Sequence, residues 1–182
     1  MLGYIKVIYP SIVIEEENKV KGIAIFYSLT GQTKKAAEQI CSELHLDLLE
    51  IETVKHMPKN RLLSIFIGGA MVSLGLYPSI KPSSISLESY DYIILGTPVW
   101  AGKCAAPVKS FIKKYGIDKT IAIFTSSGSG ENEKCIGELK SVLPLIRTQV
   151  SLVDQSQANA KENDKKLQTF IREIQKSIEH MN

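Results

Sequence analysis

Short apolar runs of strand length alternate along this chain with segments that have a helical pattern. The expected strands cover Ile23–Tyr27, Asp47–Ile51, Tyr92–Gly96, Thr120–Thr125 and Thr148–Val153. They show no clean alternation of apolar and polar residues, which is typical of strands buried on both faces of a parallel sheet. This order predicts a doubly wound α/β fold, with five parallel strands and helices on both faces of the sheet.

Helices are expected between and after these strands, at Lys34–Leu44, Pro107–Tyr115, Glu131–Leu143 and about Lys161–Met181. Each has apolar residues at helical spacing, which we interpret as core packing. The residues expected to face inward are Ala37, Ile40, Leu44, Val108, Phe111, Ile112, Tyr115, Cys135, Leu139, Val142, Leu167, Phe170, Ile171, Ile174 and Ile178.

Two segments fit this alternation less well. Residues 1–21 precede the first expected strand, and we interpret them as an N-terminal extension, with room for an added strand or hairpin, to a domain covering residues 22–182. The second segment, Leu62–Leu76, is apolar on nearly all sides and contains a Gly-Gly pair. It is compatible with a buried helix and equally with a contact between the subunits of a homodimer, because exposed apolar surface of this size usually has a partner.

Composition excludes several classes of function. The chain has 182 residues, 44% hydrophobic and 23% charged, with a net charge of +3. Since this charge is weak and forms no basic stripe, we expect no nucleic-acid partner. The three cysteines and three histidines are widely spaced, so the sequence indicates no metal cluster and no disulfide framework.

The expected location follows from the same sequence. Free cysteines are typical of a reducing compartment, and we expect a cytoplasmic protein. Pro10 interrupts the apolar N-terminus, Glu15–Glu17 follow it, and no small-residue cleavage site is present, so no signal peptide is expected. The longest apolar run is too short to span a membrane, so no membrane association is expected either.

The first expected strand ends in a turn rich in hydroxyl groups, and a helix follows at once. The turn contains the hydroxyls of Ser28, Thr30 and Thr33, together with Gly31. Backbone N–H groups at a helix N-terminus attract anions. The turn therefore predicts a phosphate site that acts through hydrogen bonds and the helix dipole, since it contains no Lys or Arg.

Two further loops are expected at the same edge of the sheet. Gly96–Lys103 follows the third strand and contains the only tryptophan, Trp100, whose flat ring can stack on an aromatic ligand. Ser126–Gly130 follows the fourth strand and offers hydroxyl and backbone donors. Ligands of such folds bind at the carboxyl ends of the strands. The three loops together predict a ligand with a phosphate at one end and a flat heteroaromatic ring at the other.

These motifs resemble the flavodoxin family. The family's phosphate motif, T/S-x-T-G-x-T, is matched by Ser28-x-Thr30-Gly31-x-Thr33. Tyr90–Gly102 resembles the family's third strand and its first loop that contacts the flavin ring, and Thr125–Gly130 resembles the second such loop. The resemblance extends from about Gly22 to the C-terminus.

The resemblance implies that the cofactor is FMN. It implies that the phosphate is held by Ser28, Thr30, Gly31, Gln32 and Thr33. It further implies that Trp100 flanks the flavin ring, with Pro98, Val99, Ala101 and Gly102 at the edge of the ring and Ser126, Ser127, Gly128 and Gly130 at the pyrimidine end. Leu29 and Thr97 are expected to contact the cofactor as well.

The chain also departs from the family. Ser126–Gly130 contains no aromatic residue to cover the second ring face, and the chain is slightly basic where well-known members are acidic. The favoured function is an electron carrier between redox partner proteins, with no catalytic side chain. The alternative is an NAD(P)H-dependent flavin or quinone reductase that reduces a small-molecule acceptor. A phosphate-binding module without flavin is the third hypothesis.

Overall fold

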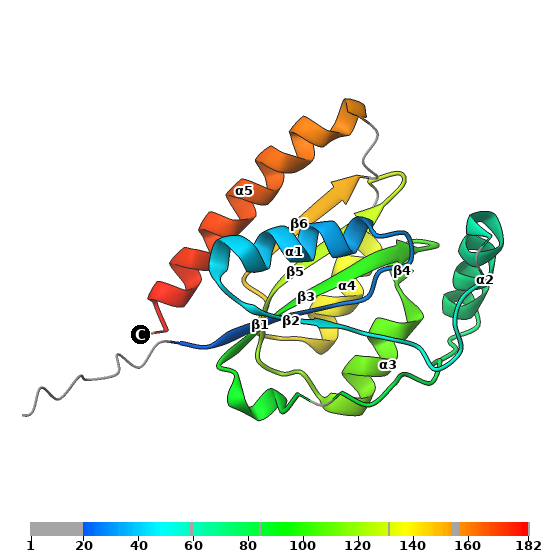
Figure 1. Cartoon of the computed structure of the whole chain (residues 1–182), viewed down its shortest axis with the longest axis horizontal. Coiled ribbons are helices and arrows are strands. Elements are labelled where there is room, and N and C mark those ends of the chain that lie inside the picture. The colour runs from blue at the N-terminus through cyan, green and yellow to red at the C-terminus, as the bar shows by residue number, and fades with distance from the viewer. Residues whose placement is uncertain (1–19, 59, 84, 131, 154–156, 182) are drawn as a thin grey trace, which may run out of the picture.

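A twisted parallel sheet forms the centre of the computed structural model, which describes residues 20–58, 60–83, 85–130, 132–153 and 157–181 (Figure 1). The strand order is β2-β1-β3-β5-β6. The strands are β1 (Gly22–Phe26), β2 (Asp47–Glu50), β3 (Tyr92–Trp100), β5 (Thr120–Ser127) and β6 (Thr148–Val153). Neighbours in this order pair in parallel. The expected doubly wound α/β fold is confirmed, and β3 lies at its centre between β1 and β5.

Burial on both faces explains why these strands do not alternate in sequence. In β1, Ile23 and Ile25 belong to the core on one side of the sheet, while Ala24 and Phe26 belong to the core on the other side. All four side chains are fully buried. Apolar residues are therefore needed at every position of the strand, as in other parallel sheets covered on both faces.

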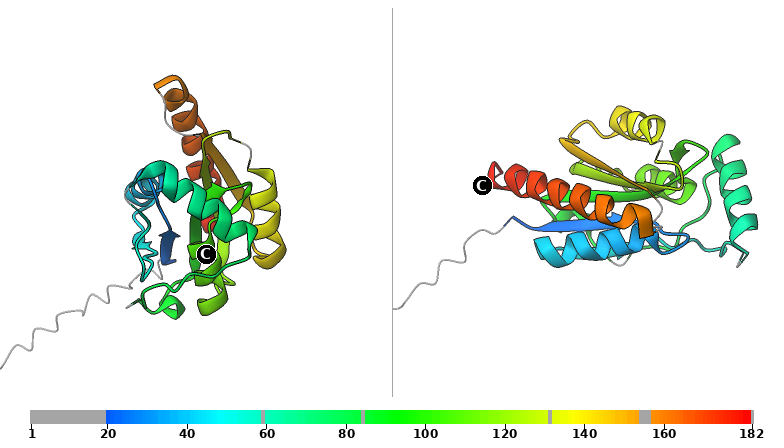
Figure 2. Two further views of the ribbon diagram at one scale, coloured as in Figure 1. Left: turned by 90° about the vertical axis from the view of Figure 1, so that its right-hand side faces the viewer. Right: turned by 90° about the horizontal axis from the view of Figure 1, so that it is seen from above.

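Two pairs of helices cover the two faces of the sheet (Figure 2). Helices α1 (Gln32–Leu44) and α5 (Gln157–Glu179) pack on one face, and α3 (Ala106–Tyr115) and α4 (Glu133–Val142) pack on the other. The inward faces expected from sequence are confirmed with one exception. Val142 is exposed and Leu143 is buried instead, because α4 ends at Val142 and the chain turns there. Glu131, the expected first residue of that helix, lies outside the described residues.

The third strand is longer than the sequence predicts. It continues through Trp100 and then reverses into β4 (Lys103–Cys104), which pairs with it antiparallel. The turn residues Ala101 and Gly102 both have positive φ, 47° and 75°, as in the tight turns that join antiparallel strands. The expected loop Gly96–Lys103 is thus a strand extension followed by a hairpin, and it projects from the carboxyl edge of the sheet.

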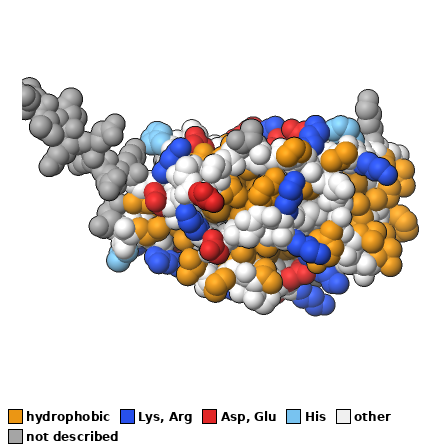
Figure 3. Space-filling view, turned by 90° about the horizontal axis from the view of Figure 1, so that it is seen from below, with side chains coloured by type: hydrophobic (Ala, Val, Ile, Leu, Met, Phe, Trp, Pro, Cys, Tyr) orange, Lys and Arg blue, Asp and Glu red, His pale blue; other side chains and the backbone are white. Residues whose placement is uncertain are grey.

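Helix α2 (Arg61–Ser73) lies beyond the carboxyl ends of the strands, apart from the helices that cover the sheet (Figures 1 and 2). Its buried positions are Ser64, Gly68 and Val72, while Leu62 and Phe66 are 78% and 74% exposed. Figure 3 shows hydrophobic side chains gathered at this end of the molecule. The interpretation of Leu62–Leu76 as a buried helix is therefore wrong.

The remaining segments are short. A 3₁₀ turn, η1 (Leu87–Ser89), precedes β3, and an isolated bridge joins Thr53 to Ile80. Residues 1–19, and with them most of the expected N-terminal extension, lie outside the described residues. Among the residues that are described, no helix combines the length and the apolar character needed to cross a bilayer.

Candidate functional site

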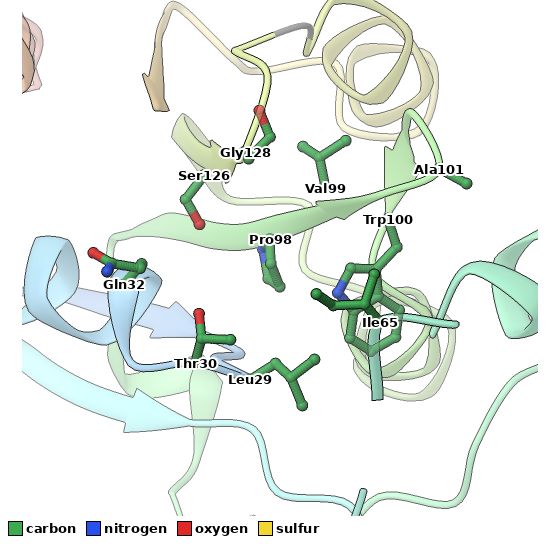
Figure 4. Close-up of a pocket in the computed structure, with 11 residues that line it drawn as sticks. Leu29, Thr30, Gln32, Ile65, Pro98, Val99, Trp100, Ala101, Ser126 and Gly128 are labelled. Carbon is green, nitrogen blue, oxygen red and sulfur yellow. The ribbon is translucent and has the colours of Figure 1, made fainter. Parts of the chain in front are cut away.

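A cavity of about 260 Å³ lies at the carboxyl ends of β1, β3 and β5, on the side where α2 stands (Figure 4). This is the position at which open α/β sheets bind their ligands. The lining residues come from the turn after β1, the ends of β3 and β5, and α2: Leu29, Thr30, Gln32, Ile65, Pro98, Val99, Trp100, Ala101, Ser126, Ser127 and Gly128.

One end of the cavity is polar. Figure 4 shows Thr30, Gln32 and Ser126 at this end, with the Thr30 and Ser126 hydroxyls turned toward the space between them. The side-chain oxygen of Gln32 is buried and has no hydrogen-bond partner. Because buried polar atoms are nearly always paired, this atom marks a place where a polar ligand group fits.

The N-terminus of α1 provides the positive end of a helix dipole beside these residues. Gly31 precedes the helix with a φ of 87°, and its N–H donates to Ser28 Oγ at 3.1 Å. No side chain caps the helix, and its first turn contains no acidic residue. Lys34 forms a 2.8 Å ion pair with Glu50. The first turn of α1 therefore suits an anion that is held by backbone N–H groups and hydroxyls.

The other end of the cavity is apolar, and Trp100, Ile65 and Leu29 lie there (Figure 4). Trp100 is only 6% exposed. Its ring meets Tyr27 edge to face, with the ring centroids 5.6 Å apart. A Cβ atom added to Gly68 would lie 2.9 Å from the indole, so α2 packs directly against the tryptophan. The indole is thus held in place by packing and presents limited surface to the cavity.

Tyr27 is neutral at physiological pH, and its surroundings move its pKa further from that range. Desolvation raises the pKa of this phenol to about 12, and the nearby Glu50 carboxylate adds to the shift. The group that orients Trp100 is therefore an uncharged ring at physiological pH.

Several residues predicted as cofactor contacts support the cavity without lining it. Thr33 is buried, and its Oγ1 lies 2.8 Å from Ser126 Oγ. Thr97 is also buried; its Oγ1 accepts from the Ala105 N–H and donates to the Pro98 carbonyl. The others that support the cavity are Ser28, Gly31, Gly102 and Gly130.

The third expected segment forms a compact turn at the end of β5. The Gly130 N–H donates to Ser127 Oγ at 2.8 Å, and Gly130 has a φ of 79°. Below it, Asn132 is buried and donates through Nδ2 to Thr125 Oγ1 at 2.9 Å. These bonds fix the backbone of the segment while leaving Gly128 at the cavity wall.

Ile65 is the lining residue that sequence reasoning did not assign to the site. The available signal was the apolar segment Leu62–Leu76, but nothing in its pattern indicates which residue faces a ligand. Among the residues that the structure describes, none that lines the cavity is ionisable. The part of the chain described by the structure contains no group of three or more His, Cys, Asp or Glu side chains that could hold a metal ion.

Solved structures of known proteins share this fold. A flavoprotein from Lactobacillus acidophilus, solved in complex with FMN, aligns over 81% of this chain and 98% of its own, with a TM-score of 0.63 and 24% identity. A flavoprotein from Bacteroides eggerthii aligns over 80% and 97%, with a TM-score of 0.62 and 20% identity. A WrbA-like flavodoxin from Agrobacterium tumefaciens aligns over 84% and 94%, with a TM-score of 0.56 and 16% identity.

Sequence relatives agree with the fold. A protein of Archaeoglobus fulgidus that is itself uncharacterised is 27% identical over 109 residues, which are 60% of this chain and 67% of that protein. The family model described as flavodoxin matches residues 69–174, more than half of the chain. The match begins within α2 and includes the hairpin that bears Trp100 and the turn after β5. With the parallel sheet, the cavity at its carboxyl edge and this family match, the chain belongs to the flavodoxin family, an FMN-binding family.

Proposed function

We propose that this protein binds FMN in the cavity at the carboxyl edge of the sheet and carries electrons on it between redox partners. The flavin supplies the electron chemistry, and the protein sets its environment and access. The observation that supports the proposal most directly is the division of the cavity into a polar end at the N-terminus of α1 and an apolar end at Trp100.

The polar end fits the phosphate of FMN. Thr30 and Ser126 offer hydroxyl donors, and the uncapped first turn of α1 offers backbone N–H groups. The side-chain oxygen of Gln32 has no partner, and the amide can turn over to present its NH₂ group as a donor there. A phosphate held in this way needs no Lys or Arg.

The apolar end fits the flavin ring. Trp100, Leu29 and Ile65 offer apolar and aromatic surface, and Val99 and Ala101 bring the backbone of the hairpin to the cavity wall. Because Gly68 and Tyr27 hold the indole in place, the ring site is rigid before any ligand binds. Such preorganisation favours binding, since little side-chain freedom is lost.

The residues that line the cavity favour the function of an electron carrier. They include no His, Cys, Asp, Glu, Lys or Arg, so the described site offers no side chain to exchange protons with a substrate. A carrier that passes single electrons between partner proteins needs none. The partners are not identified by the cavity, and a small-molecule acceptor is equally compatible with it.

One observation favours the alternative, an NAD(P)H-dependent reductase. The segment that faces the cavity from β5 consists of Ser126, Ser127 and Gly128, which are small and include no aromatic ring. A flat second molecule, such as a nicotinamide or a quinone, would find room on that side of the flavin.

An anaerobic titration of the FMN-loaded protein separates the two functions. We expect NADPH and NADH to leave the flavin absorbance unchanged, and dithionite to reduce the flavin in two resolved one-electron steps. Prompt bleaching by either nucleotide would instead assign the protein to the reductases. A purified protein that retains no FMN after loading would exclude both and leave a phosphate-binding module.

A further inference from the structure

Helix α2 exposes its large apolar side chains and turns small residues toward the body of the protein, which is the reverse of most surface helices. A surface helix normally buries its large apolar residues and exposes polar ones. In α2 the residues that face the body of the protein are small, namely Ser64, Gly68 and Val72. The exposed large residues on the helix and just after it form what we call the α2 face: Leu62, Leu63, Ile65, Phe66, Leu74, Leu76 and Tyr77.

The small inward residues have a clear structural role. Gly68 lets the helix approach Trp100 so closely that a Cβ atom at this position would lie 2.9 Å from the indole. Ser64 anchors the first turn by donating its hydroxyl hydrogen to the Pro58 carbonyl. Val72 and Met71 add apolar contacts with the core, whereas Leu62 and Phe66 remain exposed. Packing within the chain therefore gives no reason for the leucines and the phenylalanine on the outside.

The α2 face from Leu62 to Leu76 contains no Asp, Glu, Lys, Arg or His. A cation lies at its margin, where Lys113 Nζ is 4.7 Å from the centre of the Tyr77 ring. A charged partner would leave its own groups desolvated and unpaired on this surface. A second copy of the chain presents the same uncharged apolar face, and a two-fold axis would place the two faces together without like-charge repulsion.

The size of the face is sufficient for a dimer. The exposed fractions of its seven side chains range from 48% for Leu63 to 78% for Leu62. With about 150 Å² for each side chain, the lower end of the range for aromatic residues, the face exposes roughly 600 Å². Stable interfaces bury about 600–1,000 Å² on each partner, so the face reaches the lower end of that range.

The face continues into the cavity. Ile65 belongs to the α2 face, is 48% exposed, and also lines the cavity opposite Ser126 and Gly128. Hydrophobic side chains continue over the surface at this end of the molecule (Figure 3). A molecule docked on the α2 face would therefore lie beside the open side of the cavity.

We infer that two copies of the chain pair through their α2 faces, and that this pairing covers the open side of the cavity at Ile65. The dimer then shields the bound ligand from water, and ligand binding and pairing strengthen each other. The second part of the inference rests on the proposed FMN function, whereas the pairing itself does not.

Sedimentation velocity of the wild type and two variants tests the pairing. Phe66→Glu places a charge on the α2 face, and Leu145→Glu places one at another exposed apolar position, 50% exposed, at the opposite edge of the sheet. We expect dimers for the wild type and Leu145→Glu, and at least tenfold weaker association for Phe66→Glu, as for a central interface residue. Circular dichroism should show the same folded state for all three proteins.

Two results would overturn the pairing. One is a wild type that stays monomeric at about 50 μM. This result includes a monomer whose α2 face binds lipid vesicles or another protein. The other is a Phe66→Glu variant that dimerises as tightly as the wild type, which would place the interface elsewhere. If Phe66→Glu is unfolded, Leu62→Lys replaces it, because this side chain is also largely exposed.

A titration with FMN tests the coupling. We expect FMN to tighten the wild-type dimer severalfold and to bind Phe66→Glu severalfold more weakly. A dimer that binds no FMN would overturn the proposed function and leave the pairing in place. A wild-type monomer that binds FMN tightly would overturn the pairing and leave the proposed function in place. Equal FMN affinities of the wild-type dimer and Phe66→Glu would overturn the coupling between FMN binding and pairing.

Discussion

The hydroxyls of Thr33 and Ser126 lie 2.8 Å apart, although 93 positions separate them in the sequence. Thr33 belongs to the first turn of α1 and Ser126 to the end of β5. Both side chains are buried. The bond fixes the helix N-terminus against the strand, and so sets the width of the polar end of the cavity.

Thr33→Val should weaken FMN binding far more than riboflavin binding. Valine keeps the shape of threonine but removes the hydroxyl, which leaves Ser126 Oγ without this partner and loosens the polar end of the cavity. The loss of one buried hydrogen bond should lower the free energy of unfolding by about 1 kcal/mol. Isothermal titration with both flavins measures the effect. Equal losses for the two ligands would contradict a phosphate site at this turn.

Gly68→Ala and Gly69→Ala should have opposite effects on stability. A Cβ atom at position 68 would meet the Trp100 ring at 2.9 Å, whereas nothing lies within 4 Å of one at position 69. Overpacking should lower the free energy of unfolding of Gly68→Ala by about 1–3 kcal/mol. Gly69→Ala should gain up to about 1 kcal/mol from helix propensity. Urea unfolding followed by Trp100 fluorescence checks both, and two gains of similar size would show that α2 does not pack against the indole.

Substitutions at the two turn residues of the hairpin, Ala101→Gly and Gly102→Ala, should change the free energy of unfolding in opposite directions. Ala101 has a φ of 47°, which is strained for a residue with a side chain, while Gly102 adopts 75° without that strain. Ala101→Gly should raise the free energy of unfolding by up to about 1 kcal/mol, and Gly102→Ala should lower it by about 1–2 kcal/mol. Thermal unfolding of the two variants measures both changes. Stabilisation by Gly102→Ala would contradict this turn geometry.

The three thiols should react slowly with a disulfide reagent in the native protein and rapidly after unfolding. All three cysteines are free and buried. Burial raises the pKa of Cys41 to about 11. A hydrogen bond with Cys104, together with burial, raises the pKa of Cys135. The thiolate forms of Cys41 and Cys135 are therefore scarce at pH 8, and burial shields all three thiols from the reagent. A thiol that reacts as fast in the native protein as in the unfolded protein would contradict this burial.

The same shifts predict a loss of stability in alkali. As the pH rises, the unfolded chain releases the Cys41 proton near its ordinary pKa of 9.0, while the folded chain retains it to about pH 11. The stabilisation is therefore fully present below pH 9 and is lost between about pH 9 and pH 11. Urea midpoints at pH 8 and pH 10.5 test this, and Cys41→Ser should reduce the difference.

Local patterns were sufficient to predict the sheet and most of the residues that line the cavity. Ile23 and Ala24 lie in separate cores, so a continuous apolar run correctly indicated a strand buried on both faces. The hydroxyl-rich turn before α1 contributes to the polar end of the cavity, and its motif could be found because it lies within one stretch of chain. The lining residues Thr30 and Gln32 come from that motif.

Features that depend on distant contacts were not predictable in this way. The apolar composition of Leu62–Leu76 left a buried helix and a subunit contact equally open, because the orientation of α2 depends on the fit between Gly68 and Trp100, which no periodicity encodes. Ile65 reaches the cavity for the same reason. The extension of β3 was missed because Pro98 and Gly96 favour a loop by propensity, whereas pairing with β5 and β4 keeps this segment in the sheet.

The most direct test of FMN binding at this cavity is a comparison of wild-type affinities for FMN and riboflavin, followed through the fluorescence of Trp100. We predict that FMN binds at least tenfold more tightly than riboflavin, because only FMN carries the phosphate that the N-terminus of α1 would hold. We also predict that both ligands quench Trp100, since the ring site adjoins the indole. Equal affinity for the two flavins, or FMN binding that leaves Trp100 fluorescence unchanged, would contradict this account.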